Sequence, residues 1–407
     1  MKVLFVTPYI YAPEFEEHSK NNSGFGIMVY DIADAVGKKG NEVLVSTHAF
    51  GPKCICNGFS ITENSLLKNL IHGKYRGIFK FNAKLKKSNV ALKSRIRYLY
   101  YYLNLGCIEY LIKTEKPDVV HIHGCDIIID DLIKICKQNH IAFVVTLHGL
   151  LQGVAFAGEY QRFCECELIR NSAKKNIPIT VIGTKIKERF LSEYYGADSN
   201  ENVTVITNGI DVTYKEKTFK LHEKLGVSES TRIILSVGSL CKRKNQIQTV
   251  RAFSLLPPEI KDNSILVLVG SIHEGYPMIL AEIEKLGLND KVFYIGAIPR
   301  DELKNYYSAA DITVTASITE GFGLPIIEGF VYGVPCVTFA DLDAIPDIFD
   351  ESAMLLCRER SDKSLAEAIN QALNTQWDKD KIKSHAEKYS LEAMAQKYQQ
   401  MYLKLEG

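Results

Sequence analysis

The segment TEGFGLPIIEG, residues 319–329, has the strongest pattern in this chain. It directly follows the apolar run Ile312–Ala316, which has the composition of a buried strand. Glycine lets a backbone approach a ligand closely, and Pro325 suits the first turn of a helix, so the segment predicts a strand, a loop and a helix. The free N–H groups at such a helix start, together with the helix dipole, favour a bound anion.

Two carboxylates bracket this predicted helix start. Glu320 precedes it and Glu328 lies on the helix. A carboxylate accepts hydrogen bonds from sugar hydroxyls, so acids beside an anion site suit a ligand with both hydroxyls and phosphates. The alternative is one acid that favours the helix dipole and one ordinary exposed Glu. The Gly-x-Gly-x-Pro context favours the ligand site.

Outward from this segment, short apolar runs alternate with longer stretches of helical period. The runs lie at 3–8, 42–47, 118–123, 142–148, 179–183, 203–208, 233–238, 265–270, 292–296, 312–316 and 335–339. Such alternation predicts parallel sheets covered on both faces, and the strands are too many for one open sheet. We therefore expect an α/β chain with two doubly wound domains, a boundary near Ile210–Leu225, and ligands beyond the carboxyl ends of the strands.

Composition narrows the class of protein. The 407 residues carry 49 Lys and Arg against 48 Asp and Glu, a net charge of +1, which argues against a uniformly basic nucleic-acid binder. The 10 Cys lack zinc-finger spacing and indicate a reducing cytoplasm. The start Met1–Val6 predicts a strand and not a signal peptide, and no apolar run reaches the roughly 20 residues that span a bilayer.

One segment, residues 64–108, is strongly basic. Ten Lys and Arg lie between Lys68 and Arg97, and no acid occurs between Glu63 and Glu109. Apolar residues are interleaved, and the tyrosine cluster 98–102 follows. Such a stretch can lie on an anionic membrane surface or receive a phosphate-bearing acceptor, and the alternative is a solvated helical face. The concentration of charge in a near-neutral protein favours an acidic partner.

The chain resembles the retaining family-4 glycosyltransferases of the GT-B fold, of the type that builds bacterial cell-surface polysaccharide. Glu320 and Glu328, separated by seven residues in EGFGLPIIEG, match the family's central motif. Other segments resemble family motifs in the expected order: SGFG at 23–26, PDVVHIH at 117–123, VTLHG at 145–149, ITNGID at 206–211, and VGSL at 237–240 followed by Lys244.

The resemblance implies two Rossmann-like domains that face a central cleft. Residues 1–210 would form the acceptor-binding domain and residues 211–388 the domain that binds the nucleotide sugar. Residues 389–407 would form a C-terminal helix that crosses back to the first domain.

The resemblance also implies a role for each matched residue. The catalytic residues would be His148, near the reacting sugar, Glu320, on the hydroxyls of the donor sugar, and Lys244, on the diphosphate. Glu328 would hold the ribose hydroxyls. The other donor-binding residues would be Gly24 and Gly26 in the first loop, Ser239 and Arg243 in the phosphate loop, Gly296, Ala297 and Ile298 near the base, and Gly321, Phe322, Gly323 and Leu324 through their main-chain N–H groups.

The chain departs from the family at Ser239, where the family usually carries Arg. The loss removes a bidentate phosphate clamp, for which another cation of the loop, Lys242, Arg243 or Lys244, could substitute. The alternative is that Lys242 and Arg243 are plain surface charge. No cofactor is expected, because the nucleotide sugar is a substrate. No metal is expected either: His121, His123 and His148 lack a completing ligand, and Asp341-Leu342-Asp343 is interpreted as loop acids.

The expected reaction is retaining, metal-independent transfer of a hexose or N-acetylhexosamine. The donor would be a nucleotide sugar, with UDP-sugars favoured over GDP-sugars, and the acceptor a sugar or a polyprenyl-diphosphate-linked glycan. The enzyme would be cytoplasmic, at the inner membrane face or free, without a nucleic-acid partner. Two alternatives stay open: a catalytically silent nucleotide-sugar-binding subunit, favoured by Ser239, and a nucleotide-sugar epimerase or hydrolase.

Overall fold

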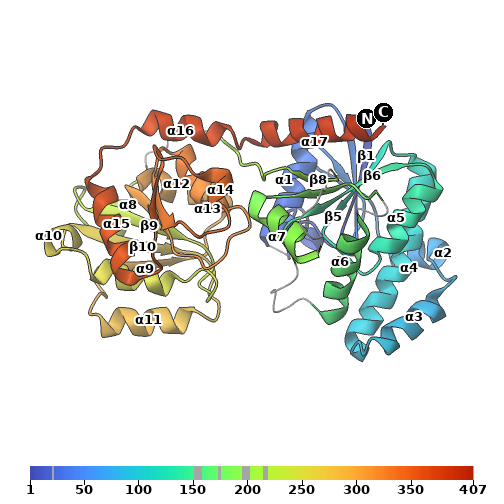
Figure 1. The fold of residues 1–407 in the computed structure, drawn as a ribbon, viewed down its shortest axis with the longest axis horizontal. Coiled ribbons are helices and arrows are strands. Elements are labelled where there is room, and N and C mark those ends of the chain that lie inside the picture. Colours follow the sequence, from blue (N-terminus) through green and yellow to red (C-terminus); the bar gives the residue numbers. More distant parts are fainter. Residues whose placement is uncertain (21–22, 151–157, 173–175, 195–201, 214–218, 407) are drawn as a thin grey trace. The chain divides into compact units, whose positions relative to one another are not determined.

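The computed structural model describes residues 1–20, 23–150, 158–172, 176–194, 202–213 and 219–406 (Figure 1). The chain divides into two compact units. Unit 1 comprises Met1–Gly209 and Leu391–Gly407, and unit 2 comprises Ile210–Ser390. Part of the predicted boundary stretch, residues 214–218, lies outside the described residues.

Unit 1 contains an eight-stranded sheet in the order β3-β4-β2-β1-β5-β6-β7-β8. All neighbours are parallel except β3 and β4. The strands are β1 (Lys2–Thr7), β2 (Glu42–Thr47), β3 (Cys54–Ile55), β4 (Ser60–Ile61), β5 (Val119–His123), β6 (Ala142–Leu147), β7 (Ile179–Val181) and β8 (Val203–Val205). The helices are α1 (Gly24–Lys38), α2 (Leu66–His72), α3 (Ile78–Lys87), α4 (Leu92–Glu115), α5 (Ile129–Gln138), α6 (Glu159–Ser172), α7 (Thr184–Tyr194) and α17 (Leu391–Glu406), with a 3₁₀ turn at Glu16–His18.

The last helix, α17, belongs to unit 1 although about 180 residues of unit 2 precede it in the chain. It packs against α1, β5 and β6. Glu392 forms an ion pair with Lys39 at 2.6 Å, and the Tyr402 hydroxyl lies 2.6 Å from Nδ1 of His121 on β5. Tyr398 and Tyr402 are fully buried, so the apolar face of α17 completes the core of this unit.

Unit 2 contains a six-stranded sheet in the order β11-β10-β9-β12-β13-β14, parallel throughout. The strands are β9 (Arg232–Val237), β10 (Ser264–Val269), β11 (Val292–Gly296), β12 (Ile312–Thr315), β13 (Cys336–Phe339) and β14 (Met354–Cys357). The helices are α8 (Leu221–Leu225), α9 (Gln246–Ser254), α10 (Pro258–Lys261), α11 (Tyr276–Lys285), α12 (Arg300–Ala309), α13 (Leu324–Val331), α14 (Ile345–Ile348), α15 (Asp362–Asn374) and α16 (Lys379–Glu387).

The sheet of unit 2 is buried on both faces. Ile234 packs in one apolar cluster with Phe253 and Phe339, whereas its strand neighbours Ile233 and Leu235 pack in another with Tyr306 and Tyr307. Successive side chains of a strand point to opposite faces, so β9 contributes to both cores. This arrangement explains why its sequence is apolar without alternation.

The predicted fold class is confirmed: the chain is α/β, with two parallel sheets. The apolar runs correspond to β1, β2 and β5–β13, although the runs at 179–183 and 203–208 extend beyond β7 and β8. The sequence did not predict β3, β4 and β14. The first two are only two residues long, too short to carry a pattern. A cleft between the two domains stays a prediction. No helix among the described residues is both long and apolar enough to cross a membrane.

Candidate functional site

In unit 2, a tight loop follows the carboxyl end of β9. Gly238 has a φ of +148°, and a Cβ placed on Gly270 would lie only 2.0 Å from the Gly238 carbonyl oxygen. The backbones that leave β9 and β10 therefore approach more closely than side chains would allow. Nε2 of Gln246, at the start of α9, donates to the carbonyl oxygens of Gly238 and Ser239 at 3.0 and 3.1 Å. These bonds fix the predicted phosphate loop.

This loop places Lys244 against Glu320. The Lys244 ammonium forms an ion pair with Oε1 of Glu320, and the two side chains are only 11% and 8% exposed. The Ser317 hydroxyl donates to the same oxygen at 2.6 Å, and Nη1 of Arg243 lies 3.6 Å from Oε2. The structure thus brings together three residues that the sequence predicts for donor binding, two of which are also predicted to be catalytic.

The Glu320 carboxylate is stabilised in its ionised form. Burial alone would raise its pKa, but the charge of Lys244, hydrogen bonds from Lys244 and Ser317, and the charge of Arg243 outweigh burial and lower it. Glu320 is therefore an anion at neutral pH. A buried carboxylate held in this way can accept hydrogen bonds from a polar ligand without taking up a proton.

The start of α13 offers unpaired donors. Gly323 has a φ of +80°, and a Cβ at this position would lie 3.2 Å from both Ala344 Cβ and Ile348 Cδ1. Both the backbone conformation and the limited space therefore favour glycine at this position. The main-chain N–H groups of residues 321–324 donate to no acceptor within the described part of the chain. Phe322 is 3% exposed, with its ring 5.7 Å from that of Tyr389. The buried phenyl anchors the loop, and its N–H groups are available to an anion.

Glu328 lies on α13 and contacts α12. The hydroxyl of Tyr307 donates to Oε2 of Glu328 at 2.8 Å. Tyr307 is 2% exposed, and burial together with Glu328 raises its pKa well above the usual range, so the phenol remains a donor. The bond orients the carboxylate. Oε1 has no hydrogen-bond partner among the described residues.

The sequence did not predict a role for Arg360. Its guanidinium lies over the ring of Phe339, 4.6 Å from the centroid, and its Nη2 donates to the Ser317 carbonyl oxygen at 3.0 Å. Its Nε donates to Oδ2 of Asp341 at 2.7 Å. Arg360 therefore fixes the loop that leads to Glu320. Asp341 accordingly forms an ion pair on a loop, and the residues that the structure describes contain no group of three His, Cys, Asp or Glu side chains that could hold a metal ion.

The three residues predicted to lie near the base are at the carboxyl end of the edge strand β11: Gly296 ends the strand, and Ala297 and Ile298 follow it. Gly296 has a φ of +94°, and its carbonyl oxygen accepts from the Gly270 N–H at 2.9 Å. Ala297 is exposed, and Ile298 packs partly buried in a core cluster. They lie at the same carboxyl edge as the loop after β9 but make no hydrogen bond to Lys244 or Glu320.

In unit 1, the structure places Gly24 and Gly26, which were predicted to lie in a loop, in the first turn of α1, next to His148. Ser23 caps α1 and accepts from the Gly26 N–H at 3.2 Å, and a Cβ on Gly24 would meet no atom within 4 Å. The ring of Phe25, between the two glycines, stands edge-on to His148 with centroids 4.9 Å apart. The first turn of α1 and the end of β6 are therefore neighbours within this unit.

A chain of histidines continues from His148 into the core. Its Nε2 lies 3.0 Å from Nδ1 of His123, while its own Nδ1 is shielded from solvent and unpaired among the described residues. Burial lowers the pKa of His148 to about 4, so the ring is neutral at pH 7. Deeper in the sheet, Nε2 of His121 lies 2.6 Å from the Thr146 hydroxyl.

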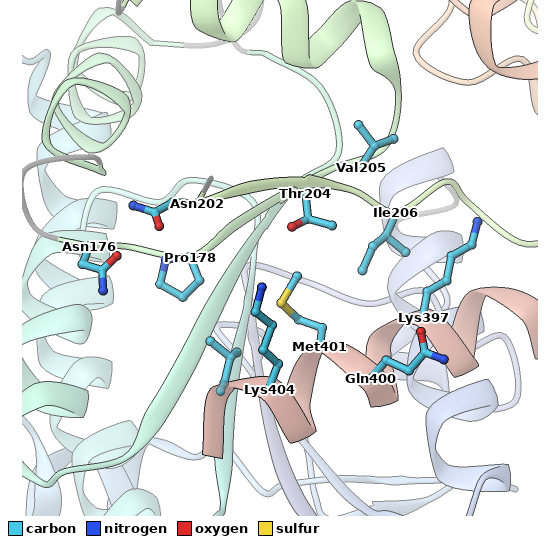
Figure 2. Close-up of a pocket in the computed structure, with 11 residues that line it drawn as sticks. Asn176, Pro178, Asn202, Thr204, Val205, Ile206, Lys397, Gln400, Met401 and Lys404 are labelled. Carbon is cyan, nitrogen blue, oxygen red and sulfur yellow. The ribbon is translucent and has the colours of Figure 1, made fainter. Parts of the chain in front are cut away.

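A cavity of about 420 Å³ lies elsewhere in unit 1, between β7, β8 and α17. Figure 2 shows Thr204 and Val205 above it and Lys397, Met401 and Lys404 of α17 below. Asn176, Pro178 and Asn202 precede their strands, whereas Thr204 and Val205 belong to β8 and Ile206 follows it, so this cavity extends along β8. None of the predicted site residues line it.

Comparisons with known proteins agree with this architecture. Residues 22–214 match the model of the family described as Glycosyltransferase Family 4, and residues 217–393 match that of Glycosyl transferases group 1. The chain is 26% identical over 431 residues to D-inositol 3-phosphate glycosyltransferase from Corynebacterium aurimucosum, covering 99% of this chain and 96% of the relative.

Two further similarities are informative. N-acetyl-alpha-D-glucosaminyl L-malate synthase of Bacillus anthracis is 24% identical over 298 residues, 68% of this chain and 74% of the relative. The structure of Anabaena HepE in complex with UDP and glucose is similar with a TM-score of 0.68, 18% identity and full coverage of both chains. From the two family matches, which together cover most of the chain, and from the two parallel sheets, we identify the chain as a GT-B glycosyltransferase of the family-4 type.

Proposed function

We propose that the chain transfers a hexose or N-acetylhexosamine from a nucleotide sugar to a glycan acceptor with retention of configuration and without a metal. The observation that carries the proposal is the buried Lys244–Glu320 pair beside the unpaired N–H groups of residues 321–324. A cation and a row of fixed dipoles at one loop suit a leaving diphosphate, whose charge grows in the transition state.

Each group in this cluster has a distinct proposed task. Lys244 neutralises the diphosphate, because its ammonium has donors beyond the one directed at Glu320. Glu320 accepts hydrogen bonds from hydroxyls of the donor sugar. The leaving phosphate itself takes the acceptor proton, so the mechanism requires no protein base on the donor side. Gly24 and Gly26 in the first turn of α1 are proposed to contribute from unit 1, as is the neutral imidazole of His148.

We place the nucleoside near Glu328. Its carboxylate is oriented by Tyr307 and has an acceptor oxygen available for ribose hydroxyls. Gly296, Ala297 and Ile298 are proposed to lie along the base. A UDP-sugar is the favoured donor and a GDP-sugar the next; the UDP bound by HepE, a protein of similar fold, supports this order.

The proposed acceptor is a sugar or a polyprenyl-diphosphate-linked glycan in surface polysaccharide synthesis, reached from the cytoplasmic side of the membrane. The named acceptors of the two curated relatives, D-inositol 3-phosphate and L-malate, are both anionic. Unit 1 of the present chain carries the basic segment 64–108, which gives an anionic acceptor an electrostatic reason to approach.

Calorimetry with UDP-, GDP- and ADP-sugars in EDTA tests the donor site. We expect one nucleotide class to bind, and Glu328→Gln to weaken it at least about tenfold. The amide oxygen can still accept from Tyr307, but its NH₂ group cannot accept from a ribose hydroxyl. Glu284→Gln, an exposed helical substitution on α11, is the matched control. Equal affinity of Glu328→Gln and the parent would exclude the ribose assignment, and absence of binding by the parent would refute donor binding altogether.

A further inference from the structure

Helices α2 and α3 of unit 1 pack on α4, and the segment 64–108 that contains them and most of α4 is here called the basic helical layer. Both short helices lie on one face of α4. Phe81 of α3 stacks on Tyr102 at 4.5 Å, and Gly106, one turn further along α4, lies against the backbone of residues 72–74 that ends α2. Figure 1 shows α2 and α3 along the outer side of α4.

The outward surface of this layer is apolar to an unusual degree. On α2, Leu66 and Leu70 form one row and Leu67 and Ile71 the next, and each is at least 63% exposed. Phe79 of α3 is 87% exposed. Tyr75 adds to this surface, as do Leu92 and Ile96 in the first turns of α4. Single exposed leucines need no explanation, but this many large apolar side chains exposed within one segment indicate a binding surface.

The same segment is basic. Lys68 pairs with Glu63 at 3.1 Å and Lys74 with Glu109 at 3.4 Å. The other basic side chains pair with no acid among the described residues, and Lys84 and Arg97 lie over tyrosine rings instead. These unpaired cations are Arg76, Lys80, Lys84, Lys86, Lys87, Lys93, Arg95 and Arg97. Their charge is uncompensated over a segment that contains no acid.

We propose that the basic helical layer docks the protein on the surface of an anionic lipid bilayer. Helices that carry exposed Leu and Phe on one side and Lys on the flanks lie in the interfacial plane, with the apolar side chains among the acyl chains and the ammonium groups at the headgroups. A nucleic acid would not require the exposed aliphatic rows, and an acidic protein would not require so many cations around them. The combination of unpaired cations and exposed apolar side chains therefore fits a lipid surface best.

The geometry assigns separate roles within the layer. Leu70 and Phe79 insert, because they are among its most exposed apolar side chains. Lys80, Lys86 and Lys87 on α3 are all exposed and bind the headgroups. Docking does not depend on the proposed transfer reaction, and it would bring a lipid-linked acceptor and the enzyme to the same surface.

Sedimentation of the full chain with vesicles tests the proposal. The parent is mixed with phosphatidylcholine vesicles that contain 30% or no phosphatidylglycerol at about 0.1 M salt, where charges more than about 10 Å apart are largely screened. The charge variant combines Lys80→Gln, Lys86→Gln and Lys87→Gln. Its control removes the same charge elsewhere through Lys363→Gln, Lys381→Gln and Lys397→Gln, all exposed. The apolar variant combines Leu70→Gln and Phe79→Gln, and its control Leu255→Gln and Leu403→Gln, both 56% exposed in the parent.

We expect the parent to bind only the anionic vesicles. Each cation near such a surface contributes about fivefold to binding, so the charge variant should lose affinity on the order of 100-fold, while its control stays within about threefold of the parent. The apolar variant should lose at least about tenfold in affinity for the anionic vesicles. Equal pelleting of a variant and its control would overturn the proposal, as would a parent that stays in the supernatant. UDP-sugar affinity of the same variants, expected to be unchanged, separates this result from a failure of the donor site.

Discussion

The ion pair between Lys244 and Glu320 can be dissected by a double-mutant cycle. Glu320→Gln retains the shape of the side chain and an acceptor for Ser317, but it leaves the Lys244 ammonium, 11% exposed, without its counter-ion. Lys244→Met leaves the 8% exposed carboxylate with Ser317 and the more distant Arg243. The double variant Lys244→Met/Glu320→Gln contains neither charge.

Removing one partner of a buried pair destabilises a protein by about 3–5 kcal/mol, because a charge stays buried without compensation. Because Glu320→Gln retains the hydrogen bond with Ser317, we expect it to lower the free energy of unfolding by about 3 kcal/mol, the lower end of this range. For a unit the size of Ile210–Ser390 this corresponds to a melting temperature lower by roughly 6–12 °C. The double variant should lose only about 1 kcal/mol, since replacing both charges removes the desolvation penalty together with the attraction.

Thermal and urea unfolding of the four proteins measures these differences. We expect the two single substitutions to be coupled by at least about 2 kcal/mol. The Glu320 pKa lies below its ordinary value of 4.5, so the stability that ionisation provides is present above that pH and is lost as the pH falls through the folded-state value. The difference between parent and Glu320→Gln should therefore shrink below about pH 4.5. Additivity within about 0.5 kcal/mol, or a difference independent of pH, would refute the buried ion pair.

Three other predictions concern single residues. Gly323→Ala should lower the free energy of unfolding by about 1–2 kcal/mol because of the φ of +80°, measured by urea titration, and should weaken UDP-sugar binding. Arg360→Gln should reduce kcat with little change in melting temperature, since the guanidinium acts through the Ser317 loop; unchanged kinetics would contradict this. Folded His148 titrates near pH 4 and an unfolded His near 6.5, so parent stability should fall between these values as pH decreases, and His148→Asn should remove part of that slope in pH-dependent unfolding.

Much of the fold could be predicted because the strands are buried on both faces. A strand such as Ile265–Val269 is apolar at every position and is bounded by turn residues, so its sequence alone distinguishes it from the helices. The donor loop could be predicted for a different reason. Gly323 and Pro325 constrain the backbone locally, and the structure starts α13 at Leu324 as that pattern requires.

The contacts within the site could not be predicted in the same way. Tyr307 approaches Glu328 because α12 and α13 pack against each other. Arg360 approaches Ser317 because parallel strands bring the loops after β14 and β12 to one edge of the sheet. No local pattern distinguishes these side chains from other tyrosines and arginines. The exposure of the apolar rows of α2 could not be predicted either, because a helical period in the sequence does not reveal which face of the helix lacks a packing partner.

The most direct test of retaining, metal-independent transfer is an assay with labelled donors. A panel of UDP-sugars is incubated with a lipid-linked glycan in EDTA, and NMR determines the anomeric configuration of the product. We expect release of UDP from one donor, a product that retains the donor configuration, and a loss of at least about a hundredfold in kcat/KM in Lys244→Met. An inverted product, a requirement for metal, or full activity of Lys244→Met would contradict it.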